Sequence, residues 1–156
     1  METLLAGLEA TAVAQSLRTS RWLYAATNTA HVFGIALLVG AIVPLNLRLL
    51  GLWPDVPRTK LVRVLVPVAA TGLALAMLAG GLLFAVRARE YAPIGFLQAK
   101  LALVALGTLA ALALHRSHGF LLDTAPDRRL RAHALLSLAC WPLALVCGRL
   151  IAFAGD

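Results

Sequence analysis

The residue whose type and position most clearly suggest chemistry is His31. It lies between Arg21 and Arg48, in a segment with no charged residue from Trp22 to Leu47. Because about 20 apolar residues are enough to cross a bilayer, the sequence predicts that the His31 imidazole lies inside a membrane. An ionisable side chain is costly there and usually faces a cavity, a partner or a cofactor. Neutral imidazole is a common ligand of haem iron, so His31 is a candidate metal ligand.

Three further polar residues are expected at a similar depth. Asn28 lies one helical turn before His31, Lys100 lies near the start of the third apolar run, and Arg149 lies near the end of the fourth. Helix direction places all of them in the half of the protein where the first apolar run begins. We therefore regard Asn28, His31, Lys100 and Arg149 as candidate cofactor-binding residues.

A second group of histidines is expected at the opposite end of the apolar runs: His115, His118 and His133. At 1.5 Å per residue, His31 and His115 differ in depth by about 14 Å, so a haem iron held by both would need a tilted or bent helix. His115 and His133 match in depth. His31, His115 and His133 are the candidate ligands of a haem iron, and His115 and His133 are further candidate cofactor-binding residues.

Each candidate also has a simpler explanation, and these alternatives stay open. The histidines of the second group could be interfacial residues at helix ends. His31 could be a core histidine bonded to Asn28 or to a backbone carbonyl. Lys100 could extend to the interface, as long cationic side chains do, and Arg149 could anchor the end of the last helix.

The elements that must position these residues are helices. The expected fold is all-α: a single transmembrane domain over residues 1–156, built as an integral membrane four-helix bundle with a short N-terminal interfacial amphipathic helix. The interfacial helix is expected over about residues 3–18, where leucines recur at helical spacing. The transmembrane helices are expected over about residues 21–48, 61–87, 94–116 and 131–153.

Each predicted span has one face of small or polar residues, and four such faces converge in the core of a bundle. In the second span, Gly72, Ala76 and Gly80 recur every four residues, which lets a neighbouring backbone or a flat ligand approach closely. The faces of the other spans comprise Tyr24, Thr27, Asn28, His31 and Gly34; Lys100, Val104, Thr108, Ala111 and His115; and His133, Ser137, Cys140, Ala144 and Cys147.

Composition supports a membrane protein and excludes several other classes. Hydrophobic residues make up 61% of the chain and charged residues 13%, whereas a soluble domain has about 45–50% apolar and about 25% charged residues. The net charge is +7, but the basic residues lie between apolar runs, so no nucleic-acid partner is expected. Phosphate-binding glycine loops, H-E-x-x-H and C-x-x-C are absent from the sequence. The spans also lack acidic residues, which argues against a carboxylate-driven transporter.

The distribution of Lys and Arg predicts the orientation. Eight lie in or beside the first and third connections, and four lie in or beside the segments at the opposite side. Because cytoplasmic loops are enriched in Lys and Arg, the first and third connections are expected in the cytoplasm. The expected location is a bacterial inner membrane, crossed several times, with both termini in the periplasm.

Several short stretches resemble an uncharacterised bacterial family of four-helix membrane proteins, which is distantly similar to a group containing the CopD copper-resistance proteins and the HemJ-type protoporphyrinogen oxidases. The shared pattern is a His in the first helix and a Lys that opens a later helix in an Ala-Lys-Leu context, matched here by His31 and Lys100. The resemblance implies haem b, with His31 as an axial ligand or redox-pocket residue and Lys100 as its partner. The matching stretches are Leu8-Glu9-Ala10-Thr11, Ser20-Arg21-Trp22-Leu23-Tyr24, His31-Val32-Phe33-Gly34, Leu47-Arg48-Leu49-Leu50-Gly51, Gln98-Ala99-Lys100-Leu101-Ala102 and Gly148-Arg149-Leu150-Ile151-Ala152.

Three functional hypotheses follow. The first is a haem-b-binding, cytochrome-like membrane protein, an oxidoreductase or electron-transfer subunit, which passes electrons between the membrane and a periplasmic redox partner or a quinone. The second is a CopD-like copper-handling protein, although the chain has only two Met residues to offer as soft ligands. The third is a structural or assembly subunit of a homo-oligomer or of a larger membrane complex. The lipid bilayer is a partner in all three.

Overall fold

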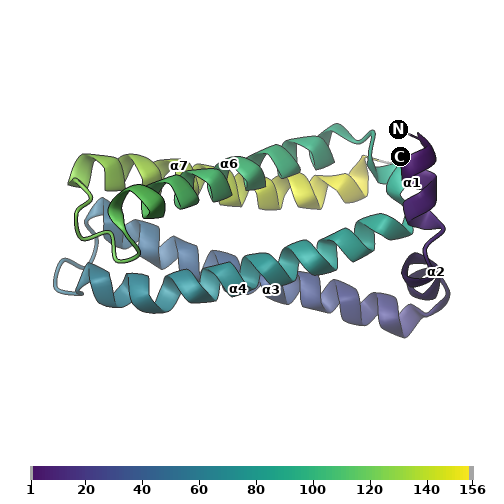
Figure 1. Ribbon diagram of the computed structural model, residues 1–156, viewed down its shortest axis with the longest axis horizontal. Coiled ribbons are helices and arrows are strands. Elements are labelled where there is room, and N and C mark those ends of the chain that lie inside the picture. The colour runs from purple at the N-terminus through teal and green to yellow at the C-terminus, as the bar shows by residue number, and fades with distance from the viewer. Residues whose placement is uncertain (1, 155–156) are drawn as a thin grey trace.

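The computed structural model describes residues 2–154, and in these residues every regular element is a helix (Figure 1). This confirms the predicted all-α class. The long helices are α3 (Arg21–Leu50), α4 (Arg58–Val86), α6 (Gly95–His118) and α7 (Asp127–Leu150), and α7 continues into a 3₁₀ turn, η1 (Ile151–Phe153). The short helices are α1 (Glu2–Glu9), α2 (Ala12–Thr19) and α5 (Ala88–Tyr91).

Within the described residues, these four long helices are long and apolar enough to cross a membrane. Their surfaces are apolar as well as their cores. In α6, only 6% of the most hydropathic 18-residue stretch is buried inside the protein. An apolar helix with so little buried surface needs an apolar surrounding, because exposed apolar area is costly in water. The four helices are consistent with a multi-pass membrane protein.

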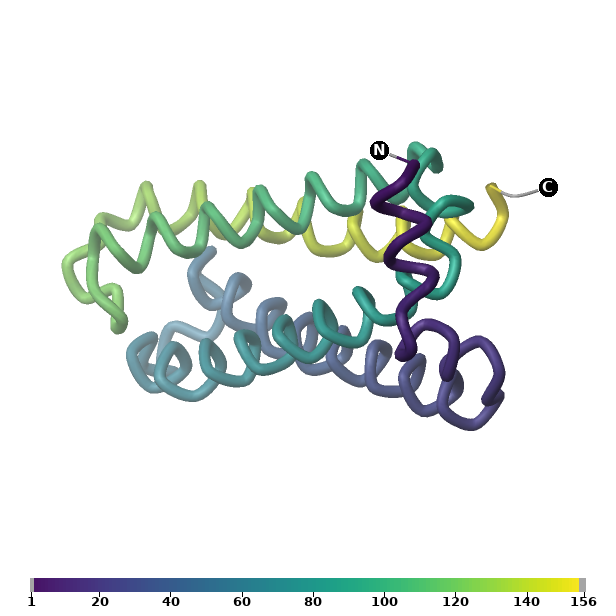
Figure 2. The backbone as a smooth tube through the Cα atoms, turned by 45° about the vertical axis from the view of Figure 1, so that its right-hand side comes forward, coloured from purple at the N-terminus to yellow at the C-terminus, as the bar shows by residue number. Residues whose placement is uncertain are grey.

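The long helices form two antiparallel hairpins, α3 with α4 and α6 with α7, which lie as two layers (Figures 1 and 2). The layers are joined mainly by α3 and α7, whereas α4 and α6 do not pack closely. We call the end that carries α1, α2 and α5 the terminal end. The opposite end, with the connections over residues 51–57 and 119–126, is the hairpin end. An apolar cluster fills the hairpin end: Leu45, Leu49, Val62, Leu114, Leu122, Ala125, Leu130 and Ala134.

The N-terminal segment differs from the single helix predicted over about residues 3–18. It forms two helices because the chain turns at Ala10 and Thr11, and the Thr11 side chain caps α2 by accepting a hydrogen bond from the Ala14 backbone N–H. Both helices lie across the terminal end (Figure 2). Ala14 and Leu17 are buried there, so α2 also packs on the bundle.

The helices α3 and α4 approach each other closely at Gly34 and Gly72. A Cβ atom added at Gly34 would lie 2.6 Å from the Ala76 nitrogen, and one added at Gly72 would lie 2.6 Å from the Leu38 nitrogen. These distances leave no room for a side chain, so the two backbones touch through glycine. The small-residue row in α4 therefore admits a neighbouring backbone at Gly72, as its spacing predicted.

A buried hydrogen bond joins α3 to α7. The Asn46 side-chain amide donates to the Ser137 hydroxyl at 2.8 Å, and both residues are buried. Sequence reasoning did not single out Asn46, because its partner lies 91 residues away. In an apolar interior each group would otherwise remain without a partner.

We expect Asn46→Ala to weaken the contact between the two layers. Interhelical hydrogen bonds in membranes are worth about 0.6 kcal/mol on average and up to about 1.7 kcal/mol. Denaturation of the purified protein in mixed micelles should show a loss of about this size. In a double-mutant cycle with Ser137→Ala, the second substitution should cost little once the first is present. Additive losses would show that the bond contributes nothing.

Candidate functional site

A cavity of about 570 Å³ lies between the two layers, in the half of the bundle nearer the terminal end. All four long helices line it, and most of its lining is apolar. The volume is within the range of about 300–1,000 Å³ that is typical of ligand and cofactor sites. The polar and charged residues that line it are Asn28 and His31 from α3, Lys100 from α6 and Arg149 from α7.

His31 is fixed in this cavity by the neighbouring helix α4. Its Nδ1 lies 2.8 Å from the Ala76 carbonyl oxygen. A carbonyl can only accept, so Nδ1 carries the hydrogen and the neutral imidazole is the Nδ1–H tautomer. The ring lies against Gly80, where an added Cβ would be 2.8 Å from His31 Cε1. The small-residue row of α4 therefore has two roles. It contacts α3 at Gly72, and it accommodates the His31 ring at Ala76 and Gly80.

The other ring nitrogen of His31, Nε2, is free. It has no hydrogen-bond partner among the described residues and is not one of the buried unpaired atoms. In the Nδ1–H tautomer, Nε2 holds a lone pair that can accept a proton or bind a metal ion. A ligating histidine almost always donates its second N–H to a carbonyl or carboxylate, which fixes the ring. The bond to Ala76 gives His31 this arrangement without a ligand.

Lys100 and Arg149 add positive charge to the cavity. Lys100 runs beside Gly148 of α7, where an added Cβ would be 3.4 Å from the Lys100 Nζ. The Arg149 guanidinium lies 5.1 Å from the centre of the Phe153 ring, over its face. None of the described residues that line the cavity is Asp or Glu. The cavity thus offers two cationic side chains with no protein carboxylate among its lining residues.

His115 and His133 lie away from this cavity. They belong to the last turn of α6 and the second turn of α7, at the hairpin end. The His115 ring stacks on Phe120 with 6.1 Å between ring centroids, and its Nδ1 is buried without a hydrogen-bond partner among the described residues. The structure therefore brings Asn28, His31, Lys100 and Arg149 together and separates them from the histidines of the other end. No cluster of three or more metal-binding side chains occurs in residues 2–154.

Three contributors to the cavity were not singled out from the sequence. Met77 of α4 and Trp141 of α7 line it, and Gly148 makes room for Lys100. Gly148 is one residue before Arg149, and a small residue beside a charged one in a span is a signal that could have been used. Trp141 offered no such signal, because its burial against Gly107 depends on how α6 and α7 pack.

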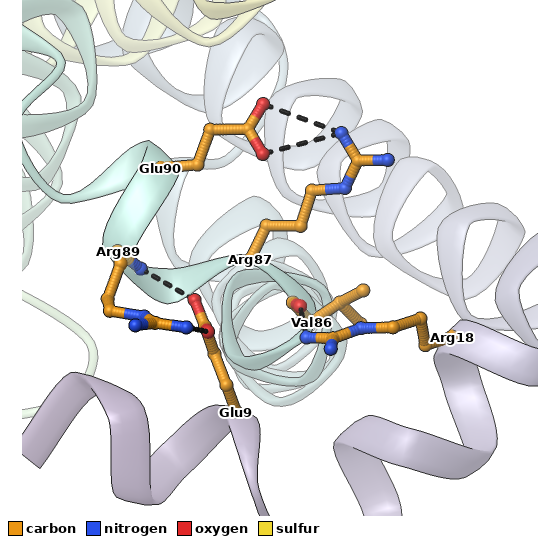
Figure 3. Close-up of a pocket in the computed structure, with 6 residues that line it drawn as sticks. All are labelled: Glu9, Arg18, Val86, Arg87, Arg89 and Glu90. Atoms are coloured by element: carbon orange, nitrogen blue, oxygen red, sulfur yellow. Dashed lines mark hydrogen bonds and ion pairs between the residues drawn. The ribbon is translucent and has the colours of Figure 1, made fainter.

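A second, polar hollow of about 460 Å³ lies at the terminal end and is drawn in Figure 3. Glu9 of α1 accepts hydrogen bonds from the backbone N–H of Arg89 and from its side chain, with an ion-pair distance of 2.8 Å. The Arg18 guanidinium donates to the Val86 carbonyl at the end of α4. These contacts fasten both N-terminal helices to the junction of α4 and α5.

We expect this fastening to weaken in acid. The Arg89 backbone N–H, and then its side chain, hold the pKa of Glu9 below the usual 4.5. A carboxyl whose pKa is lower in the folded state stabilises that state above its unfolded pKa. Its contribution is therefore present above about pH 4.5 and is lost as the pH falls through the lower folded value. Proteolysis between α1 and α2 should become faster on acidification.

The matched variants for this test are Glu9→Gln and Glu2→Gln. Glu9→Gln should be cleaved rapidly at neutral pH and should show little further change in acid. Glu2, which makes no ion pair among the described residues, serves as the control. Equal cleavage of Glu9→Gln and the wild type at neutral pH would show that the ion pair does not hold α1.

Comparison of the chain with protein-family models, with curated proteins and with solved structures finds no match in any of the three. The class that the fold defines is a helical bundle with membrane-spanning character, containing a cationic cavity with one histidine.

Proposed function

We propose that this protein binds haem b in the cavity and acts in electron transfer between the membrane and a periplasmic partner. The observation that carries the proposal is the state of His31. Its Nδ1–H is donated to the Ala76 carbonyl, which leaves Nε2 unpaired and accessible beside an apolar cavity of cofactor size. The imidazole of His31 fits haem b, because haem iron is commonly held by a histidine.

Three of the four polar or charged residues that line the cavity have a role in this proposal. His31 would ligate the iron through Nε2, and the bond to Ala76 would hold the ring in place. Lys100 and Arg149 would pair with the carboxylates of the group. Met77 lines the same cavity and would be a second candidate to hold the iron, since Met and His together ligate the iron of some cytochromes. When bound, haem b would supply one-electron transfer.

An absorption spectrum of the purified protein, oxidised and reduced, tests the proposal. We expect a Soret band in protein from haem-replete cells, and its loss in His31→Ala. His118→Ala is the matched control, because His118 belongs to the hairpin end and should leave the band unchanged. A colourless wild-type protein that also fails to take up added haem would contradict the proposal.

Copper handling is a second candidate, and the position of Met77 favours it. Met77 and His31 line one cavity, and thioether sulfur with imidazole nitrogen suits Cu(I). Metal analysis of protein from copper-supplemented cells would decide this. About one copper per chain, lost in Met77→Leu, would support copper handling, and a copper-free protein would exclude it.

We also propose that the protein lies in a bacterial inner membrane with both termini in the periplasm. The support is the charge asymmetry, since eight of the Lys and Arg residues gather in or beside the connections of the hairpin end and four at the terminal end. Alkaline phosphatase is active only outside the cytoplasm. Its fusion to the C-terminus should therefore give active enzyme, and an inactive fusion present at a normal level would reverse the orientation.

A further inference from the structure

The positive charge of the cavity has no partner within the cavity. Lys100 and Arg149 both line it, and none of the described lining residues is acidic. Neither side chain forms a salt bridge among the described residues, and the Arg149 guanidinium lies over the face of the Phe153 ring. Cations held at membrane depth are costly and are usually paired or placed at a binding site. A negatively charged group supplied by a ligand would complete this arrangement.

We infer that the cavity binds an amphiphilic carboxylate taken from the bilayer, with its acid group at Lys100 and Arg149 and its apolar body between the two layers. The inference deepens the proposed function, on which it rests for the choice of a tetrapyrrole as the first ligand. It adds the class of ligand, the group that is recognised and the route of access.

The chemistry of the two cations fits a carboxylate. Arg presents a planar fork that can bind both carboxylate oxygens, and Lys adds a compact charge with three donors. The two come from different helices, α6 and α7, and they line the cavity together with Asn28, a further side chain that can donate hydrogen bonds. The rest of the lining is mostly apolar and suits a hydrophobic body.

The route of access follows from the packing of the helices. Met77 of α4 and Leu101 of α6 line the cavity and are 53% and 51% exposed. Their helices do not pack closely against one another. The cavity is therefore bordered by side chains that face the surroundings of the spans, where the solvent is lipid. A ligand dissolved in the bilayer can reach it from the side.

Metal-free protoporphyrin IX is the probe that separates this inference from haem ligation, because it has two carboxylates and no iron. The full chain is placed in phosphatidylcholine nanodiscs with Trp22→Phe and Trp53→Phe, which leaves Trp141 as the tryptophan beside the cavity. Quenching of Trp141 then reports binding. The dimethyl ester of the same porphyrin has the same ring and no charge.

We expect the acid to bind at least about tenfold more tightly than the ester, as is typical of hydrogen bonds to charged groups. This preference should fall to near unity when Lys100→Gln and Arg149→Gln are combined, and Arg21→Gln at the start of α3 should not change it. Equal binding of acid and ester, or a preference that survives the double substitution, would overturn the inference.

Competition identifies the apolar body of the ligand. Displacement of the porphyrin by oleate but not by methyl oleate supports a site for carboxylate amphiphiles in general, and failure of oleate supports one shaped for tetrapyrroles. Acetate at the same concentration should displace nothing, and its success would overturn the requirement for an apolar body.

A retained acid preference without a Soret band would overturn the proposed function alone, and a Soret band without an acid preference would overturn this inference alone.

Discussion

Replacing Gly34 by alanine is expected to lower the free energy of unfolding by about 1–3 kcal/mol, the cost of overpacking a tight contact. The new Cβ would lie 2.6 Å from the Ala76 nitrogen and 2.8 Å from the Gly72 oxygen. Both are backbone atoms of α4, so a change of rotamer cannot relieve the contact and the two helices must separate. Denaturation of the purified protein in mixed micelles measures the loss.

Gly40 provides a control on the same helix. A Cβ added there meets nothing within 4 Å, so Gly40→Ala should be neutral or slightly stabilising, because alanine favours the helix more than glycine. The difference between the two variants isolates the contact with α4. Equal stability of Gly34→Ala and Gly40→Ala would show that α3 and α4 do not approach as closely as the structure has them.

Replacing Gly80 by alanine is expected to weaken the proposed binding of haem by about 10–100-fold, the usual cost of disturbing a group that orients a metal ligand. The added Cβ would lie 2.8 Å from His31 Cε1 and 3.0 Å from its Nδ1. Here the obstructed atoms belong to a side chain, so the ring can move. Its movement breaks the hydrogen bond to Ala76, while the bundle stays folded. Titration with haem, followed at the Soret band, measures the effect.

The adjacent residue gives the matched control. Gly81 also lines the cavity, and a Cβ added there meets nothing within 4 Å. Gly81→Ala should therefore leave the proposed binding of haem unchanged, and both variants should unfold at similar denaturant concentrations. Normal binding by Gly80→Ala would mean that the position of His31 does not matter for the ligand.

Much of the fold was predictable because the lengths of the apolar runs determine where the long helices lie. Each predicted span corresponds to one long helix, and the ends differ by a few residues. Pro44, Pro67 and Pro142 lie inside α3, α4 and α7, where a soluble helix would often break. Spans tolerate them because neighbouring groups satisfy the freed backbone atoms.

The site was only partly predictable, since periodicity gives the face of a helix but not its neighbour. The depth of each residue along its predicted helix grouped His31 with Lys100 and separated both from His115. The structure has the same grouping. Arg149 was not part of the small and polar face that periodicity indicated for its helix, yet Arg149 lines the cavity. The cavity is walled by residues of four helices, so its outline depends on where the two layers diverge.

The weak packing between α4 and α6 has a consequence for biogenesis. The two hairpins meet mainly through α3 and α7, so we expect each hairpin to form as a pair of helices before the second docks through α7 onto α3. The cavity exists only after docking, and its ligand would touch both hairpins. Because a ligand that binds only the assembled state stabilises it by mass action, we expect supply of the proposed cofactor to raise the share of newly made chain in which the two hairpins are docked.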